Sequence, residues 1–179
     1  DDPDVTDKAL IYASVEYIKD SGDPENCYRN DRIFLTGGQG VGIVTKPGLA
    51  CPVGFYAINP VPRKMIFDEV EAVAHLAGCE GGLLVRIWIP EGERLALSTF
   101  NPKLGIEGGI SVLGTSGIVE PMSESALKAT IQLELHMKAV EGQREVILTP
   151  GNYGENFLRE TLKLSLSQGV QCSNFVRES

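Results

Sequence analysis

The alternation of apolar and polar residues predicts several strands in the first half of the chain. Apolar side chains occupy every second position over residues 10–18, which is the period of a half-buried strand. The polar residues 19–31 then predict a loop. Short β-branched runs at 32–36 and 41–46 are separated by Gly37-Gly38-Gln39-Gly40, which predicts a hairpin or a sharp strand-to-strand turn.

A helix and a second hairpin are predicted next. Apolar residues recur at helical spacing over residues 62–77, with Pro62 in the first turn and Gly78 directly after the last periodic position. Residues 83–89 alternate again between apolar and more polar side chains. The turn Pro90-Glu91-Gly92-Glu93 follows, so we expect the chain to fold back into a strand at 95–98.

The pattern changes character after Pro121. Helical spacing begins with Ser123 as a candidate N-cap and stops at Gly142. The remaining chain predicts a strand at 146–148, a turn at 150–154, a helix from about 155 to 167 and a strand at 170–176. A strand-helix-strand unit of this kind is expected to have parallel strands, with ligands bound beyond their carboxyl ends.

Three glycine-rich segments are candidates for ligand contact. Residues 108–117 hold four glycines, and Gly114-Thr115-Ser116-Gly117 offers free N–H groups and two hydroxyls to a polar, anionic partner. The alternative is a tight corner between packed elements. The loop 150–154 is either a nucleotide contact at a helix N-terminus or only a turn. Residues 37–42 lack the Lys-Ser/Thr ending of a P-loop, which favours a turn.

Composition and charge narrow the class of protein. The chain has 179 residues, of which 42% are hydrophobic, so it can bury a core as one domain or two small ones. A net charge of −8 argues against general nucleic-acid binding. No apolar stretch is long enough for a membrane span, and we expect a soluble, cytoplasmic protein. The four scattered cysteines predict neither a zinc site nor a disulfide framework.

A small group of cations is the candidate site for carboxylates. Lys46, Arg63 and Lys64 flank the segment 57–62, whose prolines hold the backbone extended. The alternative is that these side chains are merely solvated. No arrangement typical of a covalent nucleophile or a metal hydrolase occurs, and neither histidine has a partner at ligand spacing.

Several motifs together resemble the CbiD family, in the family's order and along essentially the whole chain. They are residues 1–6, 40–49, 57–63, 101–106 with the run that follows, 150–154 and 173–175. The resemblance implies S-adenosylmethionine-dependent methylation of ring carbon 1 of cobalt-precorrin-5B, in anaerobic cobalamin biosynthesis. It implies an α+β, mixed-sheet domain resembling ribosomal S5 domain 2 at 1–120, and a Rossmann-like α/β portion at 121–179.

The resemblance also implies where ligands bind. We expect the cofactor, S-adenosylmethionine, against the two later glycine segments, and the tetrapyrrole substrate against the cation group; cobalt enters only within the substrate. The expected cofactor contacts are Gly114, Thr115, Ser116, Gly117, Gly151, Asn152 and Gly154. The expected substrate contacts are Lys46, Asn59, Arg63 and Lys64. No catalytic residue is predicted, because transfer from a sulfonium needs no enzyme nucleophile.

Other possibilities stay open at this point. Family members continue beyond both ends of this sequence, so we expect an internal portion, and Gln39 and Arg177 depart from the family pattern. A non-catalytic corrinoid-binding or complex-forming module is the alternative function. RNA binding, suggested by the S5-like fold alone, ranks last because of the charge. Other cobalamin-pathway enzymes and further copies of the chain remain open as partners.

Overall fold

The computed structural model describes residues 5–18, 26–114, 124–164, 169–173 and 175. The chain divides into two compact units, the first formed by residues 1–46 and 50–119 and the second by 47–49 and 120–179. The elements of the first unit are β1 (Tyr12–Ile18), β2 (Tyr28–Asn30), β3 (Ile33–Gly37), β4 (Gly40–Val41), β5 (Ile43–Val44), α1 (Pro60–Leu76), β6 (Gly82–Trp88), α2 (Gly92–Ala96), β7 (Ile106–Glu107) and β8 (Gly109–Ile110). Those of the second are α3 (Glu124–Val140), β9 (Ile147–Thr149), α4 (Asn152–Glu160) and β10 (Gly169–Gln171).

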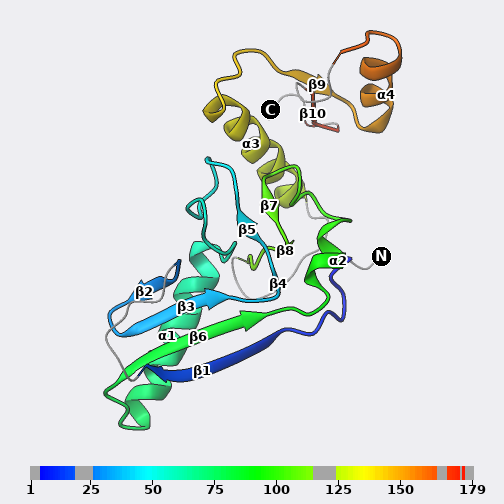
Figure 1. Ribbon diagram of the computed structural model, residues 1–179. Helices are drawn as coiled ribbons and strands as arrows, with labels where there is room; N and C mark the ends of the chain where they lie inside the picture. Colours follow the sequence, from blue (N-terminus) through cyan, green and yellow to red (C-terminus); the bar gives the residue numbers. More distant parts are fainter. Residues whose placement is uncertain (1–4, 19–25, 115–123, 165–168, 174, 176–179) are drawn as a thin grey trace. The chain divides into compact units, whose positions relative to one another are not determined.

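A four-stranded mixed sheet is the largest element of the first unit (Figure 1). Its order is β1-β6-β3-β2, with β6 parallel to β3 and antiparallel to β1, and with β2 antiparallel to β3. Every residue of β3 is buried, as expected for a strand that has neighbours on both sides. The mixed α/β character that the sequence predicts is therefore confirmed.

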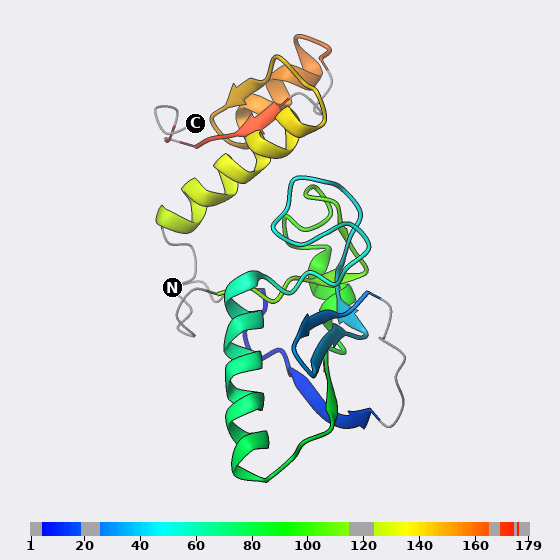
Figure 2. The same cartoon turned by 90° about the vertical axis from the view of Figure 1, so that its left-hand side faces the viewer.

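Helix α1 lies along one face of this sheet (Figure 2). It begins at Pro60, whose missing N–H costs nothing in the first turn, and Phe67 and Ala74 are its buried residues. The helix stops where Gly78 takes a left-handed backbone conformation (φ +65°). The predicted helix is confirmed, with its start at Pro60.

Three glycines allow the backbones of β4, α2 and β8 to cross at close contact. A Cβ atom on Gly40 would lie 1.8 Å from the carbonyl oxygen of Ile89, and one on Gly92 would lie 2.0 Å from that of Gly40. A Cβ on Gly109 would lie 2.3 Å from the same Gly40 oxygen. These glycines are therefore required by packing between backbones, which leaves no room for a phosphate-binding role at this crossing.

The second unit has a short parallel sheet of its own. Strands β9 and β10 pair in parallel, with Val170 opposite Leu148, and α4 lies between them in sequence. Its core consists of Ile131, Val170 and Cys172, with Leu135, Leu148 and Phe175 packed against them. The predicted parallel strand-helix-strand unit is confirmed, and α3 ends before Gly142 (φ +84°) as expected.

The structure corrects several predictions in the first unit. The predicted loop at 19–31 includes β2, whose single buried side chain left no periodic signal. The hairpin between 32–36 and 41–46 is wrong, because β3 pairs with β2 and β6 while β4 pairs with β8; the sharp-turn alternative is confirmed. The hairpin strand at 95–98 is also wrong. Close packing of Gly92 against Gly40 starts α2 there instead.

Two boundaries also differ in the second unit. The helix predicted for about 155–167 begins earlier and ends earlier, as α4, because Gly151 can form the turn before it in a conformation open to glycine. The strand predicted for 170–176 is shorter, since β10 ends at Gln171. Ser123, the predicted N-cap of α3, lies outside the described residues.

The glycine crossing predicts unequal effects of alanine at two adjacent positions. Gly109→Ala places its methyl group against the Gly40 backbone and should lower the free energy of unfolding by about 3 kcal/mol. Gly108→Ala has open space around its methyl group and bears only the strain of φ +76°, about 1 kcal/mol. Guanidinium chloride unfolding of both variants measures the difference. Equal losses would contradict the proposed crossing.

Candidate functional site

The N-terminus of α1 is tied to the beginning of the glycine-rich run 108–117. The N–H of Val112 donates to the carbonyl of Ala57 (2.8 Å), and the N–H of Asn59 donates to the carbonyl of Val112 (2.9 Å). Ile58 and Val112 form an isolated parallel bridge. The predicted substrate residue Asn59 therefore lies beside the strand that leads to Gly114. Thr115, Ser116 and Gly117 lie outside the described residues.

Arg63 stacks on an aromatic ring at this end of α1. Its backbone N–H donates to the carbonyl of Asn59 (3.0 Å), and its Cζ lies 4.1 Å from the centre of the Tyr28 ring. The Nε atom is buried and has no hydrogen-bond partner. A planar guanidinium held this way is suited to a carboxylate, because its donors have a fixed direction.

Tyr28 is a rigid platform under that guanidinium. The side chain is 6% exposed, and its hydroxyl donates to the carbonyl of Tyr56 at 2.6 Å. The Phe55 ring lies 5.2 Å away, tilted against it. Burial, with a further contribution from the neighbouring Cys51 thiol, raises the pKa of Tyr28 well above its usual range. The phenol therefore stays protonated at physiological pH.

Cys51 and Asn59 lie beside Tyr28 and Arg63, and we call these four residues the corner at the N-terminus of α1. The buried Cys51 thiol donates to the carbonyl of Ile58 (3.3 Å) and to Oδ1 of Asn59 (3.4 Å). The side-chain oxygen of Asn59 is thus oriented by the thiol. Sequence reasoning missed Tyr28 and Cys51, since both act through partners that are distant in sequence and neither lies in a recognisable motif.

Lys46 and Lys64, the two lysines predicted as substrate contacts, have surroundings that differ from those of Arg63. Lys64 is exposed and forms an ion pair with Asp68, one helical turn further along α1. Lys46 follows β5, and its side-chain stem covers Gly105, where a Cβ would meet it at 2.4 Å. The structure therefore brings Asn59 and Arg63 together and gives Lys64 a partner of its own.

The side chain of Asn101 forms two hydrogen bonds with the beginning of the glycine-rich run 108–117. Its buried side-chain amide donates to the carbonyl of Gly109 (3.2 Å) and its Oδ1 accepts from the hydroxyl of Ser111 (3.0 Å). A buried amide with both ends satisfied fixes the backbone it touches. Asn101 therefore orients the strand that pairs with residues 57–59.

The predicted cofactor loop of the second unit lies at the carboxyl end of β9. Gly151 has a conformation (φ 77°, ψ −161°) accessible essentially only to glycine, and a Cβ there would meet nothing within 4 Å. Gly154 is packed, because a Cβ would lie 2.6 Å from that of Thr149. Asn152 begins α4. Each glycine thus has a structural reason, and the space beside Gly151 is open.

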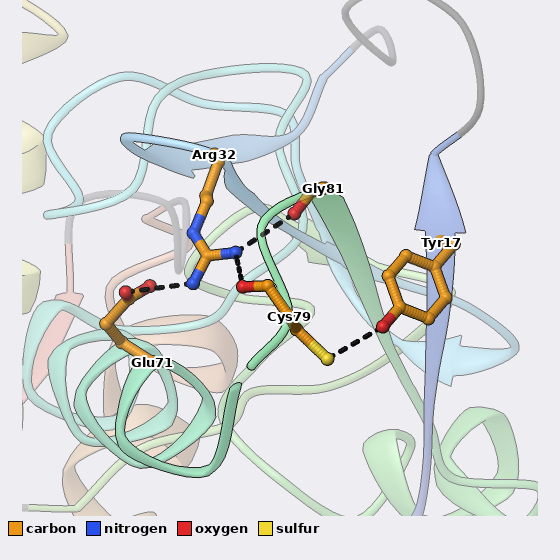
Figure 3. A network of polar contacts seen from close by, with 5 residues as sticks. All are labelled: Tyr17, Arg32, Glu71, Cys79 and Gly81. Atoms are coloured by element: carbon orange, nitrogen blue, oxygen red, sulfur yellow. Dashed lines mark hydrogen bonds and ion pairs between the residues drawn. The ribbon is translucent and has the colours of Figure 1, made fainter. Parts of the chain in front are cut away.

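Arg32, unlike Arg63, forms hydrogen bonds and an ion pair through its guanidinium (Figure 3). Its guanidinium donates to the carbonyls of Cys79 and Gly81 and pairs with Glu71 at 3.0 Å, which ties β3 to the end of α1. Nearby, a 2.7 Å hydrogen bond joins the Tyr17 hydroxyl to the Cys79 thiol and raises the pKa of Tyr17. This arginine has protein partners for its charge, so it holds the fold together.

An apolar groove of about 380 Å³ lies next to this network, between β1 and α1. Its apolar lining includes Val15, Val73 and Leu83, and its ionisable groups include Glu16 and Glu69. A carboxylate-rich ligand does not fit such a surface, because desolvation and like charge both oppose binding. Such a ligand suits the corner around Arg63 better than this groove.

Within the described ranges, no three His, Cys, Asp or Glu side chains are grouped so that they could hold a metal ion. None of the described helices is both long and apolar enough to cross a bilayer.

Comparison with known sequences decides the family. The CbiD family model matches residues 1–121, more than half of the chain. The chain belongs to the CbiD family. A relative from Ruminiclostridium cellulolyticum is 47% identical over 179 residues, covering 100% of this chain and 44% of that protein. One from Thermoanaerobacter sp. is 49% identical, covering 94% and 43%. Both are named cobalt-precorrin-5B C(1)-methyltransferase.

The chain aligns with only part of each of these relatives. This CbiD chain spans less than half the length of the curated relatives that it matches. A crystal structure of a cobalamin biosynthesis protein (cbiD) from Archaeoglobus fulgidus aligns with 98% of this chain and 51% of that one, at 24% identity and a TM-score of 0.49.

The raised pKa of Tyr28 predicts how the stability of this CbiD chain depends on pH. The unfolded phenol titrates near pH 10, whereas the folded one keeps its proton to higher pH, so its contribution is complete below pH 10 and declines above it. Between pH 10 and 11 the free energy of unfolding should fall about 1 kcal/mol more than in Tyr28→Phe, because the unfolded phenol loses most of its proton over that interval. Urea unfolding at several pH values measures both slopes, and identical slopes would contradict the assignment.

Proposed function

We propose that the protein containing this chain methylates ring carbon 1 of cobalt-precorrin-5B, with S-adenosylmethionine as methyl donor. The observation that carries the proposal is the identity of 47% along the whole chain with a protein named for that reaction. The membership of residues 1–121 in the CbiD family supports it further. The reaction class is a C-methyl transfer, for which cobalt is part of the substrate.

The substrate side of the proposal rests on the corner at α1. A precorrin carries acetate and propionate groups, and the chain as a whole has a net charge of −8, so the substrate needs a local cation. Arg63 supplies one, with a guanidinium stacked on Tyr28. Asn59 adds an amide oriented by Cys51. Lys46 and Lys64 remain predicted substrate contacts.

The cofactor side of the proposal rests on the loop after β9. The residues present fit an anionic or hydroxyl group of S-adenosylmethionine, because α4 begins without a side-chain cap and Gly151 opens onto free space. Tyr153 is 90% exposed beside them and offers an aromatic face to an adenine. The parallel pair β9 and β10 supports the Rossmann-like description of residues 121–179, and the mixed sheet supports the S5-like description of 1–120.

The main task of the protein in this reaction is to position the methyl donor and the substrate. A sulfonium methyl donor is already activated, so the enzyme must align donor and ring carbon and exclude water. Arg63 and Asn59 would orient the tetrapyrrole through its peripheral groups, and the loop at Gly151 would hold the donor. Backbone segments that glycine and Asn101 keep rigid are suited to this task.

Methylation by the longer protein tests the proposed function. With S-adenosylmethionine labelled in its methyl group and cobalt-precorrin-5B as substrate, we expect the label at ring carbon 1 of the product, identified by NMR. A protein that binds the corrinoid but transfers no label would instead favour the non-catalytic corrinoid-binding module. Label at another ring carbon would contradict the assigned reaction.

The exposed Tyr153 provides a test of the cofactor site that leaves the fold intact. Tyr153→Ala should weaken S-adenosylhomocysteine binding to the longer protein about fivefold, because loss of stacking on a base costs about 1 kcal/mol. Tyr153→Phe, which keeps the ring, is the matched control and should bind within about twofold of the original protein. Calorimetric titration measures both. Unchanged affinity of Tyr153→Ala would remove Tyr153 from the cofactor contacts.

A further inference from the structure

Three arginines of the first unit differ in how their donors are used. Arg32 donates to two carbonyls and pairs with Glu71. Arg29 lies over the Phe34 ring at 5.1 Å and donates its Nε to the carbonyl of Asp31 at 2.8 Å. Arg63 lies closer to its ring, and within the described residues its guanidinium makes neither a hydrogen bond nor an ion pair. The guanidinium of Arg63 therefore has N–H donors without a partner among the described residues, whereas Arg32 and Arg29 both donate hydrogen bonds to the protein.

The unpaired Nε of Arg63 has a cost for the folded state. A buried donor without a partner loses its hydrogen bonds to water and gains none in return. The guanidinium nevertheless lies there, with its Cζ 4.1 Å from the centre of the buried Tyr28 ring. The cost at Nε is part of holding the guanidinium over the Tyr28 ring, and the hydrogen-bonding capacity open to a ligand lies in the two Nη groups.

The contact with Tyr28 leaves the two Nη groups of the Arg63 guanidinium for a ligand. The ring of Tyr28 covers one face, and the Tyr28 hydroxyl is committed to the carbonyl of Tyr56, so it does not compete for the same acceptor. The two Nη groups, which are not among the buried unpaired atoms, present parallel N–H donors outward. Two parallel donors match the two oxygens of a carboxylate.

We propose that Arg63 is a bidentate carboxylate site for one side arm of the tetrapyrrole, and that Tyr28 is its positioning residue. This inference rests on the proposed function for the identity of the ligand. Tyr28 holds the guanidinium plane by stacking, so that the arginine loses less rotamer freedom when it binds. The site selects a carboxylate over the corresponding amide, because an amide offers one acceptor and turns its own donors toward Arg63.

The experiment compares two ligands on the longer protein. The probes are a cobalt corrinoid with free carboxylates and the same corrinoid with those carboxylates converted to amides, titrated by absorbance. The original protein should bind the acid at least about tenfold more tightly than the amide. Arg63→Lys keeps the charge but loses the planar fork, and should lose most of that preference.

Variants of Tyr28 separate positioning from a general loss of structure. Tyr28→Phe keeps the ring and should retain the preference, whereas Tyr28→Leu removes the platform and should reduce acid binding about fivefold with unchanged S-adenosylhomocysteine affinity. Arg29→Lys is the matched control, since that neighbouring arginine also covers an aromatic ring but has its Nε satisfied. It should bind both corrinoids as the original protein does.

The outcomes distinguish this site from the proposed function. If the original protein methylates its substrate but Arg63→Lys keeps the full preference for the acid, the carboxylate site is wrong and the function stands. If Tyr28→Leu binds like Tyr28→Phe, the positioning role is wrong. If no methylation occurs while Arg63→Lys abolishes the preference, the site stands and the enzymatic function does not.

Discussion

The contact on which the first unit depends is the crossing of three backbones at Gly40, Gly92 and Gly109. Any side chain at these positions would overlap a carbonyl, at distances of 1.8 to 2.3 Å from the Cβ it would add. The crossing joins β4, α2 and β8, elements of only two to five residues that could not persist alone. Because β8 is held there, the segment that follows it pairs through Val112 with residues 57–59, directly before the N-terminus of α1.

That placement explains how an acidic chain could hold an acidic ligand at the proposed site. Asn101 fixes the strand from one side, and Asn59 receives it on the other, one turn before Arg63. Most charged side chains of α1 are exposed or paired, as Lys64 is with Asp68, and contribute little direction. Arg63 differs because its guanidinium lies over the buried Tyr28 ring, 4.1 Å from the ring centre. The charge of the whole chain matters less than this one orientation.

The sequence predicted the elements whose signal is local. Strands at β1 and β6 and the helices α1 and α3 follow from periodicity, and the parallel pair β9 and β10 follows from the order of elements. The hairpin expected at 95–98 failed because Gly92 is used for a contact with Gly40, about fifty residues earlier, which no local pattern encodes. The local pattern at 57–63 likewise predicted Asn59 and Arg63 as substrate contacts, which stays a prediction, but gave no signal for Tyr28 on its three-residue strand.

We propose that the corner of Tyr28, Asn59 and Arg63 receives a carboxylate of the tetrapyrrole. The most direct measurement is a crystal structure of the longer protein with a carboxylate-bearing cobalt corrinoid and S-adenosylhomocysteine. We expect one carboxylate within hydrogen-bond distance of both Nη atoms of Arg63, with the Tyr28 ring stacked on the guanidinium. A corrinoid whose carboxylates are all held by other residues, with Arg63 contacting only solvent, would contradict the account.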